Sequence, residues 1–115
     1  MGLDVLMASL LDAIRRLAQD PAAQERWLRE DGTWPSLDEL VLTFDDVQGA
    51  AAALVAYGDV GPDAVAEIGL VAEHIHEMSQ HGGAWEPQAL RSDPAWEELR
   101  RLAARALESL NAVRV

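Results

Sequence analysis

The chain has 115 residues, 50% of them hydrophobic, so its length suits one domain with one core and is too short for two. It has no cysteine, which excludes disulfides, thiolate metal sites and cysteine nucleophiles and predicts a reducing, cytoplasmic environment. Its 20 acidic residues outnumber 9 basic ones, all arginine, and the net charge of −11 disfavours direct binding to nucleic-acid phosphates.

Helix signals fill the first third of the chain. Apolar residues at helical spacing predict a first helix over residues 3–18. The Asp-Pro pair at 20–21 marks the start of a second helix, and Gly32 marks its end. Ser36 and Glu39 have the spacing of a capping box, which predicts a third helix that begins directly after Ser36.

The sequence LVLTF, residues 40–44, allows two interpretations, a short strand or a continuing helix. We interpret it as a helix that breaks near Thr43 and restarts at Asp45 and Asp46, whose charges suit a helix N-terminus. The restarted segment would be a fourth helix that carries QGAAAALVAYG, residues 48–58, whose small side chains allow another helix to approach closely.

The second half predicts three further helices. Pro62 opens a fifth helix that runs to about residue 80, and close packing is the expected reason for Gly69 in its middle, at a cost of ~1 kcal/mol relative to alanine. Glu86 and Pro87 start a short sixth helix, and the Asp-Pro pair at 93–94 starts the last one. Its apolar stripe is Trp96, Leu99, Leu102, Ala103, Ala106, Leu107 and Leu110. The pattern predicts an all-α, single-domain bundle of five or six helices joined by short loops.

The negative charge is concentrated in the middle of the chain. Residues 30–90 contain twelve acidic residues and no arginine or lysine, whereas the two ends are nearly balanced. Such a field attracts a basic protein, so we predict a non-enzymatic interaction module that binds a basic partner. Solubility alone, or a general acidic bias of the genome, would also explain the charge. The candidate docking residues are Asp38, Glu39, Asp45, Asp46, Glu73 and Glu77.

The chain is similar in kind to the bacterial immunity proteins that neutralise nuclease toxins. The similarity lies in size, acidity, helicity and lack of cysteine. It is one of composition, and no motif in the residues carries it.

All three histidines lie within AEHIHEMSQH, residues 72–81. On a helix, His74 and His76 point to opposite flanks and cannot chelate one ion together. Glu77 shares a flank with His74 and His81, but the two histidines are two turns apart, so a metal would need ligands from another helix. A metal- or small-ligand-binding protein that uses this flank is the second hypothesis. A surface charge pair with some pH sensitivity is the simpler interpretation, and no metal or cofactor is predicted.

Other constellations give no catalytic site. None of the serines lies in a GxSxG context, and the absence of lysine excludes a P-loop and a Schiff base. The longest uncharged run, residues 47–58, is far shorter than the ~20 residues that span a bilayer, so no membrane association is predicted. The tryptophans are expected to pack helix ends onto the core. A third hypothesis is a structural subunit that self-associates into a homo-oligomer through Trp27, Trp34, Trp85 and Trp96.

Overall fold

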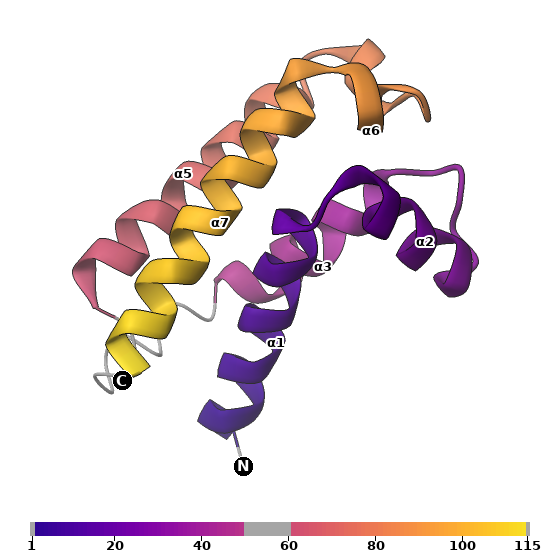
Figure 1. Cartoon of the computed structure of the whole chain (residues 1–115). Helices are drawn as coiled ribbons and strands as arrows, with labels where there is room; N and C mark the ends of the chain where they lie inside the picture. The colour runs from indigo at the N-terminus through magenta and orange to yellow at the C-terminus, as the bar shows by residue number, and fades with distance from the viewer. Residues whose placement is uncertain (1, 50–60, 115) are drawn as a thin grey trace.

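The computed structural model describes residues 2–49 and 61–114 (Figure 1). These residues form six α-helices, one short 3-10 helix and no strand, which confirms the all-α prediction. The predicted fourth helix over QGAAAALVAYG falls almost entirely outside the described residues. The elements are α1 (Gly2–Ala18), α2 (Pro21–Asp31), α3 (Asp38–Gln48), α5 (Pro62–Met78), η1 (Gly82–Trp85), α6 (Ala89–Ser92) and α7 (Pro94–Arg114).

The long C-terminal helix α7 organises the bundle. It packs along α5 as an antiparallel pair and also along α1, while α3 packs on α1 and meets α5 (Figure 1). The apolar stripes that the sequence predicts face this shared core, as in α1, where Leu10, Ile14 and Leu17 are fully buried. In α7 the buried members are Trp96, Leu99, Ala103, Ala106 and Leu110. The amphipathic periodicity therefore identifies the core faces correctly.

Two Asp-Pro pairs start helices as predicted. The Asp20 side chain accepts a hydrogen bond from the backbone N–H of Ala23 at 2.8 Å at the start of α2. Before α7, the Asp93 carboxylate accepts one from the backbone N–H of Ala95 at 2.9 Å. Gly32 ends α2 in the left-handed conformation at φ 82°, where a side chain would be strained.

Two predictions about α3 are wrong. Ser36 does not cap the helix, because Leu37 occupies the N-cap position in a helical conformation and its side chain is buried in the core. The helix does not break at Thr43 either, and the whole LVLTF segment is helical. The Thr43 hydroxyl points back to carbonyls of its own helix. Leu40 and Phe44, on either side of Thr43 in the sequence, are both buried in the core, which keeps the helix continuous through this position.

The tryptophans at the helix ends pack against the core. Trp96 is fully buried and donates its indole N–H to the carbonyl of Ala84 at 2.7 Å. Trp85 lies edge-on to it, with ring centroids 5.7 Å apart and an interplanar angle of 85°. Trp27 and Trp34 are partly buried, and each carries an arginine guanidinium over its ring, at 4.1 Å for Arg16 and 4.8 Å for Arg29.

Gly69 does not mark a close helix contact. A Cβ atom at this position would meet no atom within 4 Å, and the residue is exposed. The packing explanation from the sequence is therefore wrong, and nothing in the structure explains the glycine.

One buried polar side chain ties four helices together. Gln24 of α2 is fully buried, and its amide donates to the carbonyls of Arg16 at 3.2 Å and Leu17 at 3.1 Å, at the end of α1. Arg100 of α7 donates Nε–H to the Gln24 carbonyl at 2.9 Å and a second N–H to the carbonyl of Leu90 in α6. Burial lowers the pKa of Arg100. This cluster satisfies every polar group of Gln24 in the interior.

Candidate functional site

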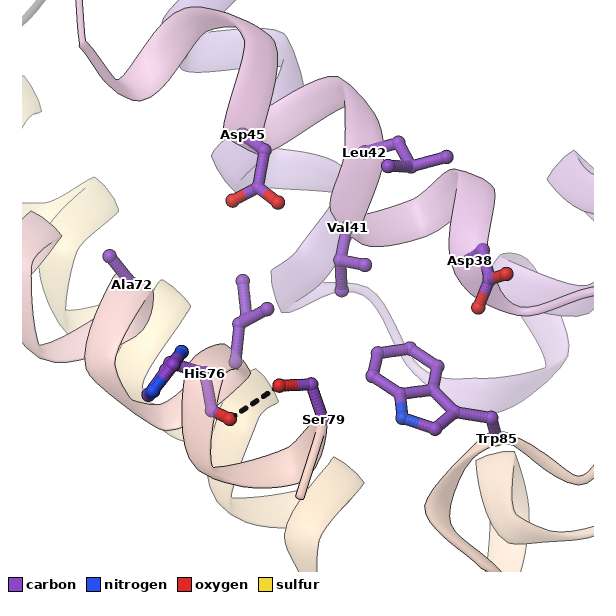
Figure 2. Close-up of a pocket in the computed structure, with 9 residues that line it drawn as sticks. Asp38, Val41, Leu42, Asp45, Ala72, His76, Ser79 and Trp85 are labelled. Carbon is purple, nitrogen blue, oxygen red and sulfur yellow. Dashed lines mark hydrogen bonds between the residues drawn. The ribbon is translucent and has the colours of Figure 1, made fainter. Parts of the chain in front are cut away.

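A groove of about 370 Å³ opens between α3 and α5, and Trp85 closes one end of it (Figure 2). On each side of the groove four residues follow the spacing i, i+3, i+4 and i+7, so each side presents one face over two turns. The lining residues are Asp38, Val41, Leu42 and Asp45 from α3, Ala72, Ile75 and His76 from α5 with its C-cap residue Ser79, and Trp85 from η1.

The floor of the groove is apolar and its position is fixed by the core. Val41 and Ile75 belong to the main core cluster, with only 5% and 6% of their surface exposed. Leu42 lies on the rim with 47% of its surface exposed, which is unusual for a large apolar side chain in this structure. Trp85 is held in place by its edge-on contact with the buried Trp96. The apolar surface that the groove offers to solvent therefore comes mainly from Leu42 and the partly buried Trp85, above a floor of two core side chains.

Two carboxylates stand on the α3 side of this apolar surface. Asp38 lies near the Trp85 end of the groove. Asp45 lies two helical turns further along α3, opposite Ala72 (Figure 2). Partial burial raises the pKa of Asp45 above its ordinary value, and the adjacent charge of Asp46 raises it further. A cation that approached the groove would relieve both effects.

Neither carboxylate has an arginine partner within the described part of the chain. The ion pairs found there join Arg15 to Asp12, Arg29 and Arg91 to Glu25, and Arg101 to Glu98, and they lie on α1, α2, α6 and α7. The arginines thus pair with some of the acids on those four helices. In the described residues, none of these ion pairs reaches an acid of α3 or α5.

His76 and Ser79 lie across the groove from Asp45, but they form no catalytic relay. The Ser79 hydroxyl donates its proton to the backbone carbonyl of His76 at 2.6 Å, within its own helix. Among the described residues, no hydrogen bond joins Asp45 to the His76 ring. The arrangement is suited to binding: it combines apolar contact, a flat aromatic ring and two anionic acceptors.

The six docking residues proposed from the sequence divide into two groups. Asp38 and Asp45 line the groove. The others do not line it: Glu39 and Asp46 lie elsewhere on α3, and Glu73 and Glu77 are exposed on another face of α5. Sequence reasoning missed Val41, Leu42, Ala72, Ile75, His76, Ser79 and Trp85 as site residues.

The histidine flank does not assemble into a metal site. The Nε2 atom of His74 lies 2.8 Å from the carbonyl oxygen of Ala95 in α7, so this nitrogen must carry the proton and donate it. His76 lies on the groove side of α5, which confirms that the two histidines point to opposite flanks. His81 sits outside the helix, before η1, and no ion pair joins Glu77 to a histidine among the described side chains. In these residues no three histidine or acidic side chains converge as metal ligands.

No helix in the described ranges combines the length and apolar character needed to cross a membrane. Comparison with protein-family models, with curated proteins and with solved structures gives no match.

Proposed function

We propose that this chain is a non-enzymatic protein-interaction module that binds a basic partner in the groove between α3 and α5. The observation that carries the proposal is the combination found there: an apolar floor, an aromatic wall and two unpaired carboxylates on one preformed surface. The groove also lies in the segment of the sequence that has no positive side chain. The negative electrostatic potential of the two groove carboxylates and that of the surrounding acidic segment thus both favour a cationic ligand.

The two kinds of surface have different roles in binding. Exposed ion pairs contribute only about 0–1 kcal/mol each, so Asp38 and Asp45 mainly speed encounter and fix orientation. Most of the affinity must come from apolar burial on the exposed Leu42 and on Trp85, because tryptophan is frequent among the dominant residues of interfaces. A purely charged ligand would therefore bind weakly, and one that also carries apolar side chains would bind more tightly.

The proposal sets a chemical class for the partner. A basic nuclease toxin, which is what the immunity proteins of similar composition neutralise, would meet the charge requirement. A nucleic acid would not, because its phosphates face twelve acidic residues in this segment of the sequence.

The test is affinity capture from a native lysate with the immobilised chain, followed by elution with increasing salt. The wild type should retain basic proteins that salt releases, and the Asp38→Asn/Asp45→Asn double variant should lose them. Asp63→Asn is the single-charge control, because Asp63 is exposed at the far end of α5 and outside the groove.

Capture that is insensitive to both salt and the double variant would refute the electrostatic proposal. Capture of acidic proteins would refute it as well.

A further inference from the structure

The groove has a defined length and charge spacing. Asp38 and Asp45 are seven residues apart on one face of α3, which places them two turns, or about 10 Å, apart along the helix axis. Ala72 and Ser79 bound the groove over the same two turns of α5. A ligand that satisfies both carboxylates must therefore carry two cationic groups about 10 Å apart, with apolar side chains between them.

A helix with cations seven residues apart gives this spacing on one face. An extended segment covers the same distance in three residues, but side chains three residues apart on it point to opposite sides. The groove favours the helix. Its walls are helices, which satisfy their own backbone groups, and the described residues contain no strand edge onto which an extended peptide could add. A helical ligand satisfies its own backbone hydrogen bonds, whereas an extended one would leave its N–H and C=O groups without partners over the apolar floor.

We infer that the occupant of the groove is a basic amphipathic helix of the partner protein, with arginine or lysine at positions i and i+7 and large apolar residues at i+3 and i+4. The inference rests on the proposed function and specifies its ligand. The helix would lie along α3 and α5 as a third helix, its apolar residues on Val41 and Ile75 and against Trp85, and its cations at Asp38 and Asp45. This pattern complements the Asp-Val-Leu-Asp face of α3 residue for residue.

The test uses blocked, alanine-based peptides of about 18 residues, long enough to hold helix in water. The matched peptide has arginine at i and i+7 and leucine at i+3 and i+4. A shifted peptide has the same composition, with the second arginine moved two positions, to the opposite face of the helix. A third peptide carries a central proline, which breaks the helix at unchanged charge. Dissociation constants for the full chain are measured by titration calorimetry at low salt.

The matched peptide should bind several-fold more tightly than the shifted peptide, which loses one ion pair, and about tenfold more tightly than the proline peptide, which loses its helix. Asp38→Asn and Asp45→Asn should each weaken the matched peptide several-fold, and Asp63→Asn should leave its affinity unchanged. Circular dichroism of each variant checks that the fold is retained.

Equal affinity for all three peptides would overturn the helical inference. If that equal binding still depended on Asp38 and Asp45, the proposed function would stand, whereas the absence of any binding would remove both. A chain that dimerises in light scattering, with Asp38→Asn/Asp45→Asn restoring the monomer, would show a second copy in the groove and would also overturn the inference.

Discussion

The Gln24→Leu substitution tests what holds α2 in place. Leucine keeps most of the volume of glutamine, so the change removes the polar contacts without opening a large cavity. Three hydrogen bonds disappear: those to the carbonyls of Arg16 and Leu17, and the one received from Arg100. The N–H of Gln19 still donates to the Arg16 carbonyl, at 3.3 Å. The Leu17 carbonyl and one N–H of Arg100 are left facing a leucine side chain.

The size of the effect follows from these contacts. The two neutral hydrogen bonds are worth about 1 kcal/mol each, and the one from the charged guanidinium is worth about 1.5–3 kcal/mol. The additional apolar burial of leucine offsets about 1 kcal/mol. We therefore expect Gln24→Leu to lower the free energy of unfolding by about 3 kcal/mol. That is a large share of the 5–15 kcal/mol typical of a domain.

Urea unfolding followed by circular dichroism measures this loss, with tryptophan fluorescence as a second probe. Gln88→Leu is the matched control, because Gln88 is exposed and should change stability by less than about 0.5 kcal/mol. Arg100→Leu completes a double-mutant cycle, in which the double variant should lose at least about 1 kcal/mol less than the sum of the single ones. A loss below about 1 kcal/mol for Gln24→Leu, or strict additivity in the cycle, would refute the reasoning.

Three further outcomes are expected. Gly69→Ala should raise stability by about 0.5–1 kcal/mol in the same urea assay, since the new methyl group meets no atom. Glu25→Gln should lower the melting temperature at neutral pH, because the Arg29 hydrogen bond lowers the pKa of Glu25; the difference should fade as pH falls from 4.5 through the folded-state pKa. Asp45→Asn should raise the melting temperature at neutral pH, because burial raises the pKa of Asp45, and its advantage should vanish once pH falls to about 3.8.

The fold could be predicted from the sequence because its signals are local. Apolar residues at helical spacing and Asp-Pro starts depend only on neighbours along one helix. They identify α1, α2 and α5 with ends correct to about two residues, and they identify the start of α7. The errors in α3 came from the same local rules. Ser36 and Glu39 have the spacing of a cap, but the burial of Leu37 in the core determines where the helix begins.

Only half of the groove could be predicted. Asp38 and Asp45 are candidates from the sequence because they are acids in a segment without arginine or lysine. Their spacing with Val41 and Leu42 places all four on one face once the segment is known to be one helix. The contribution of α5 was hidden, because nothing in a single sequence says which face of α5 meets α3. Glu73 and Glu77 were included on charge alone, since composition does not distinguish one face of a helix from another.

The position of Asp45 provides a test that distinguishes the proposed docking surface from acidity that serves solubility alone. Acids that serve solubility can take any arrangement, and exposed ones cost little stability. Asp45, in contrast, lines the groove, where partial burial and the neighbouring charge of Asp46 raise its pKa, and an asparagine there would carry no charge to disfavour. A destabilising charge beside exposed apolar surface is typical of a site whose energy is recovered when a partner binds. Asp45→Asn should therefore gain stability and bind the matched peptide several-fold more weakly, with both effects measured on the same preparation by thermal unfolding and calorimetry. If Asp45→Asn loses stability as well as affinity, or leaves stability and affinity unchanged, Asp45 is an ordinary surface charge.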